Sequence, residues 1–113
     1  MPSARKGMFI KMNNTLGLIG LAKRAGKLSA GEFLCERAIK GGQAKLTVIA
    51  SDISDNARKK ITDACKFYGV KCVEFASSGE LGKSIGADSR MVVCINDENF
   101  SNAILSKIER IDE

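Results

Sequence analysis

The stretch Leu28–Ala50, LSAGEFLCERAIKGGQAKLTVIA, is the most informative part of this sequence. Ser29 and Glu32 have the spacing of a capping box, in which a serine and a glutamate satisfy free backbone groups at the start of a helix. We expect that helix to end before the pair Gly41–Gly42. Residues 45–51 (KLTVIAS) then form a short, β-branched apolar run, which is typical of a buried central strand. The stretch therefore predicts a helix followed directly by a strand.

The same alternation continues on both sides of this stretch. A first helix is expected at residues 14–25, with Asn13 or Asn14 as its N-cap and Gly26 as its stop, before a short extended link at residues 27–28. After the central strand, the sequence predicts helices at 54–68, 78–85 and 99–111 and strands at 70–76 and 90–96. Such alternation is typical of an α/β fold, here a three-layer α/β/α sandwich with a four-stranded mixed sheet.

The charge of the chain is unevenly distributed. The 113 residues have a formal net charge of +5 and are few enough for one domain. Residues 1–60 contain twelve Lys or Arg and four Asp or Glu, whereas residues 61–113 contain six and nine. We expect residues 1–11 to form a disordered basic arm and residues 12–113 to form a single domain. The basic half is the one expected to face a polyanion, although a basic surface kept for solubility would have the same composition.

The residue types that are missing exclude several kinds of chemistry. The sequence contains no His, which removes the commonest general base and the commonest zinc ligand. Its four cysteines, at positions 35, 65, 72 and 94, form no C-x-x-C pair, so we expect no metal and no cofactor, and interpret each as a small buried apolar residue. No signal-peptide pattern and no long apolar run is present, so we expect a cytoplasmic protein with reduced thiols and no membrane partner.

One segment imitates a nucleotide-binding loop. Residues 77–84 (SSGELGKS) follow a predicted strand and end like a phosphate loop, but Ser77 stands where the first glycine is needed. Gly86 also ends the following helix too early. We therefore interpret the segment as a short surface helix in which Gly82 packs closely against a neighbour, and expect no small-molecule substrate. A nucleotide-handling enzyme would need an affinity for nucleotides that depends on Lys83.

The helix that begins near Gly31 has the features of a phosphate-binding site. A helix start offers unpaired backbone N–H groups and the positive end of the helix dipole. Glu32 has two interpretations, as part of the capping box or as an acceptor for a base amino group. Phe33 or Leu34 is a candidate for stacking on a base, while one of the two is expected to face the core. The candidate phosphate clamp consists of Lys27, Arg37, Lys40 and Lys45.

Several strings in this sequence resemble one known family. LGLIGLAKRAGKLSAGE, GQAKLTVIASDIS and the later LGKSIG and VVCI are together similar to the ribosomal L7Ae and L30e superfamily, and in particular to its small bacterial YlxQ-like branch. The resemblance covers the chain from Leu16 to Ile108. It implies an α/β/α sandwich that binds RNA kink-turns, with a helix start against the sheared G·A pairs and an apolar loop over extruded nucleotides.

The resemblance also assigns positions in this sequence. The helix start corresponds to residues 31–34, and the loop corresponds to Ile85–Arg90 (IGADSR). Phe33 and Leu34 stand where the strongest binders of the family carry Asn and Glu, and Glu32 lies one position away. The combined set of predicted RNA-binding residues is Lys27, Ser29, Gly31, Glu32, Phe33, Arg37, Lys40, Lys45, Ile85, Gly86 and Arg90.

These observations favour a non-catalytic RNA-binding protein. Its expected partners are structured RNA, either kink-turn-like or ribosomal, together with ribosomal proteins. The alternative is a protein-interaction module that keeps the same fold and has lost the kink-turn contacts. Steep salt dependence of an RNA complex would discriminate the two, because several phosphate contacts release several counterions.

Overall fold

The computed structural model describes the backbone of residues 2–111 and the side chains of residues 10–111. Five helices and four strands alternate along this part of the chain: α1 (Pro2–Arg24), β1 (Leu28–Ala30), α2 (Glu32–Lys40), β2 (Leu46–Ile49), α3 (Asp55–Tyr68), β3 (Lys71–Glu74), α4 (Ser78–Ser84), β4 (Val92–Ile95) and α5 (Glu98–Ile111). The three predicted strands are present but shorter than predicted. The fourth strand, β1, lies where the sequence suggested only an extended link.

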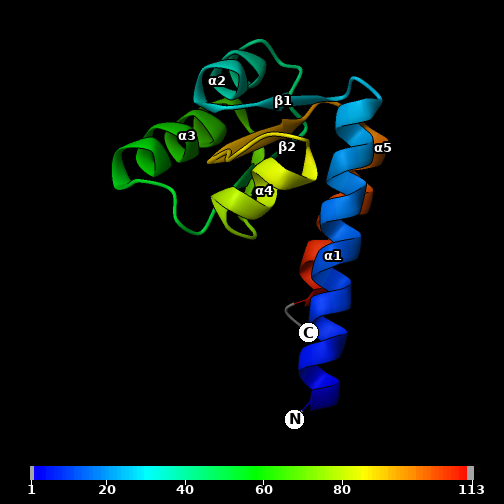
Figure 1. Cartoon of the computed structure of the whole chain (residues 1–113). Coiled ribbons are helices and arrows are strands. Elements are labelled where there is room, and N and C mark those ends of the chain that lie inside the picture. Colours follow the sequence, from blue (N-terminus) through cyan, green and yellow to red (C-terminus); the bar gives the residue numbers. More distant parts are fainter. Residues whose placement is uncertain (1, 112–113) are drawn as a thin grey trace.

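The four strands form one mixed sheet in the order β1-β4-β2-β3. The neighbours β2 and β3 are parallel, whereas β4 runs antiparallel to both β1 and β2. Ile95 of β4 pairs with Leu28 on one side and with Leu46 on the other. Helices α2 and α3 cover one face of the sheet and α1 and α5 cover the other, with α4 beside α1 (Figure 1). The predicted three-layer α/β/α sandwich is therefore confirmed.

Two apolar clusters fill the spaces between the layers. Alternate residues of one strand point to opposite faces, so Val48 joins the cluster under α1, α4 and α5, and Ile49 joins the cluster under α2 and α3. Three of the four cysteines are fully buried in the second cluster, and Cys72 is half-buried beside it. All four are free thiols, in agreement with their interpretation as small apolar residues.

The start of the first helix differs from the prediction. The helix begins at Pro2 rather than at about Asn14, so residues 2–11 continue α1, and neither Asn13 nor Asn14 is its N-cap. Its end is as predicted: Gly26 adopts φ 73°, and its N–H donates to the Lys23 carbonyl at 3.0 Å. The side chains of residues 1–9 lie outside the described part of the chain, so a separate role for residues 1–11 stays a prediction.

The predicted capping box at Ser29 is also wrong. Ser29 lies inside β1, and the N-cap of α2 is Gly31, which has no side chain with which to cap a helix. The serine–glutamate spacing is met at Ser77 and Glu80 instead, where both reciprocal bonds form at the start of α4. The two serine–glutamate pairs have the same spacing, so spacing alone does not distinguish them. What distinguishes them is that Ser29 pairs in a strand, and a serine in a strand cannot also cap a helix.

No helix within residues 2–111 combines the length and the apolar character that crossing a bilayer requires. The same part of the chain contains no cluster of three or more His, Cys, Asp or Glu side chains that would hold a metal ion.

Candidate nucleic-acid interface

The start of α2 is fixed by a glycine turn at the edge of the sheet. β1 leads into Gly31, whose N–H donates to the Val92 carbonyl at 2.9 Å. Gly31 adopts φ 92° and ψ 157°, a backbone conformation that only glycine occupies without strain. Because no side chain caps this helix start, its first-turn N–H groups are available to an anionic ligand.

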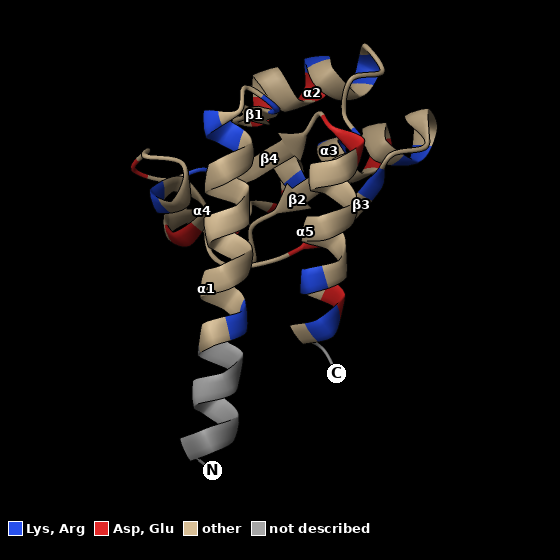
Figure 2. Cartoon of the chain, turned by 90° about the vertical axis from the view of Figure 1, so that its right-hand side faces the viewer, with Lys and Arg blue, Asp and Glu red and all other residues tan. Residues whose placement is uncertain are grey.

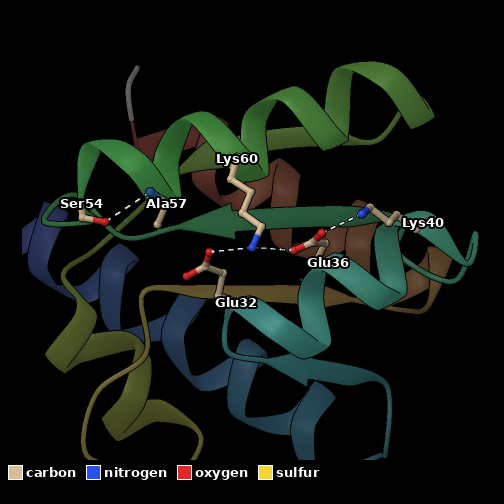
Figure 3. Close-up of polar contacts among 6 residues, drawn as sticks. All are labelled: Glu32, Glu36, Lys40, Ser54, Ala57 and Lys60. Atoms are coloured by element: carbon tan, nitrogen blue, oxygen red, sulfur yellow. Dashed lines mark hydrogen bonds and ion pairs between the residues drawn. The ribbon is translucent and has the colours of Figure 1, made fainter.

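One flank of α2 is neutralised by the protein itself (Figure 3). Lys60 of α3 reaches across to Glu32 and Glu36, with Nζ–O distances of 3.4 and 3.1 Å. Lys40 pairs with Glu36 at 2.7 Å. Hydrogen bonds from Lys40 and Lys60 lower the pKa of Glu36, and Glu36 in turn raises the pKa of Lys60. The charges of Glu32 and Lys40 are thus already engaged within the chain.

The other flank of α2 is apolar and positively charged. Phe33 is 70% exposed and Leu34 is 50% exposed, so the expectation that one of them faces the core is wrong. The core positions of this helix are Cys35, Ala38 and Ile39. The guanidinium carbon of Arg37 lies 5.8 Å from the centre of the Phe33 ring, within the range of a cation–π contact. This flank combines an aromatic surface with a cation.

Two grooves adjoin this flank and share Leu34. The first, which we call the α2 groove, has a volume of about 510 Å³ and is lined by Ser29, Leu34, Arg37, Ala38, Gly42, Gln43, Lys45 and Asn96. The second, which we call the loop groove, has a volume of about 310 Å³ and is lined by Lys23, Leu28, Ala30, Leu34, Ile85, Gly86, Ala87 and Arg90. Within the described residues, Arg37, Lys45, Lys23 and Arg90 form no ion pair.

Close packing against α4 holds the loop on the far side of the loop groove. A Cβ atom at Gly82 would lie 2.5 Å from the Cα of Ser89, so only glycine allows the loop to approach this closely. The Arg90 N–H donates to the Ser78 carbonyl at 2.9 Å, and the Ala87 N–H donates to the Gly82 carbonyl at 2.8 Å. The close contact predicted for Gly82 is confirmed, and it gives the loop a defined position.

The family comparison agrees with this architecture. Residues 13–106 match the model of the ribosomal protein L7Ae/L30e/S12e/Gadd45 family. The chain belongs to this family. It is 40% identical over 92 residues to the RNA-binding protein YlxQ of Bacillus subtilis, covering 81% of this chain and 92% of the relative. It is also 40% identical over 94 residues to the RNA-binding protein YlxQ of Enterococcus faecium, covering 83% and 90%.

Solved structures of the same fold are similar as well. A Bacillus halodurans protein described as having unknown function has a TM-score of 0.80 and 33% identity, with 88% of this chain and 97% of that chain covered. The 15.5 kD RNA-binding protein of Giardia lamblia has a TM-score of 0.72, with 94% and 88% covered. Because the two sequences are 19% identical, this similarity shows that they share a fold and nothing more.

The predicted site residues of this L7Ae-family chain fall into four groups. Ser29, Arg37 and Lys45 line the α2 groove, while Ile85, Gly86 and Arg90 line the loop groove. Gly31, Glu32, Phe33 and Lys40 lie on or directly before α2, outside both grooves. Lys27 precedes β1 and is exposed, and its carbonyl accepts a hydrogen bond from the Asn96 N–H at 2.8 Å. Figure 2 shows Lys and Arg at the end of α1 that meets β1, and on the neighbouring α2.

Sequence reasoning missed several lining residues, above all Lys23 and Asn96. Asn96 follows β4, and its Nδ2 donates to Ser29 Oγ at 2.9 Å, while its Oδ1 is buried without a hydrogen-bond partner in the described part of the chain. Pairing of β1 with β4 brings Ser29 and Asn96 together, and no local pattern in the sequence indicates this pairing. Lys23 was detectable, because it is a basic residue in the last turn of a helix that leads into the site.

Proposed function

We propose that this chain is a non-catalytic RNA-binding protein that binds structured RNA across the α2 groove and the loop groove. The observation that carries the proposal is the α2 groove, where Arg37 and Lys45 form no ion pair among the described residues, next to a helix whose start has no side-chain cap. Cations and free N–H groups on one surface suit a phosphate backbone. Two relatives that are 40% identical are named RNA-binding proteins, which supports the same class of ligand.

The α2 groove is the proposed backbone-binding half of the site. Arg37 and Lys45 line it, and Lys27 lies close by through the contact of its carbonyl with Asn96. The first-turn N–H groups after Gly31 are the proposed donors to phosphate or to base edges. Because Glu32 is held by Lys60, we assign its role to the backbone rather than to its carboxylate. Lys40, which pairs with Glu36, makes a weaker contribution than Arg37.

The loop groove is the proposed base-binding half. Leu34 and Ile85 supply apolar surface, Gly86 leaves room for close approach, and Lys23 and Arg90 supply positive charge. This composition suits a splayed-out nucleotide, which proteins recognise by stacking and shape. Phe33, exposed beside Arg37, is a further stacking surface. We therefore propose a kink-turn-like or ribosomal RNA in the cytoplasm as the ligand, with ribosomal proteins as neighbours.

The test is a titration of labelled kink-turn RNA, beside an unkinked duplex of matched length, at two salt concentrations. We expect kink-selective, salt-sensitive binding. Arg37→Glu should lower the affinity about tenfold or more and make the salt dependence shallower, because a cation that contacts phosphate is replaced by an anion. Lys40→Glu should lower it less. The matched control is Arg110→Glu on α5, which has the same charge change on the far face of the sheet.

Equal binding of both RNAs would reduce the proposal to a general basic RNA surface. Unchanged affinity in Arg37→Glu would refute the proposed surface, and no binding to either RNA would refute the function. The second candidate is then a protein-interaction module, which the exposure of Phe33 and Leu34 favours, since adjacent exposed apolar side chains are also typical of protein contacts.

A further inference from the structure

Two neighbouring aromatic side chains are exposed at the end of α3, outside the site described above. Phe67 is 82% exposed and Tyr68 is 46% exposed. Their ring centres lie 4.9 Å apart with an interplanar angle of 65°, an edge-to-face pair. Each ring therefore supports the other while leaving aromatic surface open to solvent. Gly69 follows in a left-handed conformation and ends the helix directly after the pair.

The charge around this pair favours a polyanion. Lys66 immediately precedes Phe67, and Lys71 begins β3 two residues after Gly69. Within the described side chains, Lys66 and Lys71 form no ion pair, whereas Arg58 is paired with Glu74 at 2.6 Å. Asp63 is the one acidic residue of α3 after its first turn. The remaining charge at this end of the helix is positive.

Helix α3, which carries the aromatic pair, covers the same face of the sheet as α2, the helix of the proposed RNA site. α3 packs beside α2 on one face of the sheet, and Lys60 joins the two helices through Glu32 and Glu36 (Figures 1 and 3). The grooves adjoin the opposite flank of α2, so an RNA strand that leaves them reaches α3 by crossing α2 over the paired Glu32, Glu36 and Lys60. Exposed aromatic rings flanked by cations are the combination that single-stranded nucleic acids use, because every base has a face that stacks on a ring.

We propose that Phe67 and Tyr68 form a second RNA contact, on which unpaired nucleotides adjoining the structured RNA stack while Lys66 and Lys71 contact their phosphates. This contact rests on the proposed function, because it needs RNA as the occupant. It extends the bound segment beyond the two grooves and adds affinity for single-stranded flanks without adding selectivity for the kink. A protein partner at the same surface is the alternative that the experiment separates.

The experiment uses the single tyrosine of the chain as a reporter. Protein labelled with 3-fluorotyrosine has one ¹⁹F resonance, from Tyr68. We compare a kink-turn RNA with the same RNA carrying a single-stranded extension at one end or the other. The resonance should shift or broaden with an extended RNA and stay in place with the unextended one. Phe67→Ala should lower the affinity for the extended RNA about tenfold and leave that for the unextended RNA unchanged.

Ile10→Ala is the matched control, since it also removes an exposed apolar side chain but lies on α1. A resonance that does not move with any extended RNA, or equal affinities of Phe67→Ala and the unchanged protein, would overturn the second contact while the groove site stands. Loss of binding to the unextended RNA in Arg37→Glu reports on the groove site separately. If no RNA binds the unchanged protein, both proposals are wrong, and a protein becomes the expected partner of the surface formed by Phe67 and Tyr68.

Discussion

The two flanks of α2 treat their charges in opposite ways. On the flank toward α3, Glu32, Glu36, Lys40 and Lys60 neutralise one another within the protein. On the flank toward the grooves, Arg37 lies over the ring of Phe33 and forms no ion pair among the described residues. A nine-residue helix thus has one flank that holds it to its neighbour and another that is open to a partner. Counting the cations on a helix therefore does not identify its binding surface, whereas finding which of them lack a partner does.

Gly31→Ala would disturb both flanks at once, and we expect the largest effect on stability from it. The φ of 92° and ψ of 157° at this position are costly for any residue with a Cβ, by about 1–3 kcal/mol. The substitution should therefore lower the free energy of unfolding by that amount, measured by urea denaturation. Relief of the strain would turn the start of α2 and misplace both flanks, so RNA affinity should fall as well.

The control for this substitution is Gly17→Ala in α1. A Cβ at Gly17 would contact nothing within 4 Å, and the residue lies in a helix. Alanine there should stabilise the protein by roughly 0.5–1 kcal/mol, the ordinary difference between alanine and glycine in a helix. If Gly31→Ala unfolds at the same urea concentration as the unchanged protein, a positive φ does not fix the start of α2.

Lys60→Met alters only the paired flank of α2, so we expect a smaller effect from it. It removes the cation that holds Glu32 and Glu36, so both carboxylates become freer to repel a nearby phosphate. We expect RNA affinity at low salt to fall about twofold, because exposed ion pairs are weak and water screens them. Lys59→Met is the control, since Lys59 is an exposed neighbour without an ion pair in the described part of the chain. An equal loss of RNA affinity in Lys60→Met and Lys59→Met would mean that RNA binding responds only to the net charge of the protein.

The sequence predicted the layers of this fold because apolar periodicity reports which face of an element is buried. The helix predicted at 54–68 also agrees with α3, which Ser54 caps and Gly69 ends, since each of these residues acts through its own local backbone geometry. β1 was missed because three residues are too short to display a period. That omission caused the error at Ser29, which pairs with Cys94 in the sheet and is therefore not available as a cap.

The site was harder to predict than the fold for a related reason. Ion pairing between Lys60 and α2 joins residues that are far apart in the sequence, and nothing near Glu32 indicates it. The contact between Asn96 and Ser29 depends in the same way on pairing of β1 with β4. Sequence reasoning named the candidate cations but not the partners that some of them have within the protein. Which charges are open to a ligand follows only once tertiary contacts are known.

The smallest expected effect concerns the paired flank at low pH. Hydrogen bonds from Lys40 and Lys60 lower the pKa of Glu36 from its ordinary value of 4.5. A carboxyl group whose pKa is lower in the folded protein adds stability above its ordinary pKa, and this stability is lost as the pH falls through the folded value. Ser78 lowers the pKa of Asp52 in the same direction, through bonds of 2.6 and 2.8 Å.

Thermal unfolding between about pH 6 and pH 3 should therefore show a falling midpoint, and Glu36→Gln should make the fall shallower without abolishing it, because Asp52 remains. Lys60 makes no contribution to this slope. The pKa of Lys60 is raised in the folded protein. Its stabilising effect is therefore complete below its ordinary pKa of 10.5 and is lost only as the pH rises through the pKa in the folded protein. Arg37→Gln, on the open flank, should leave the slope unchanged. A shallower slope in that variant would show that the open flank also has a carboxylate partner, and the contrast between the two flanks would then be lost.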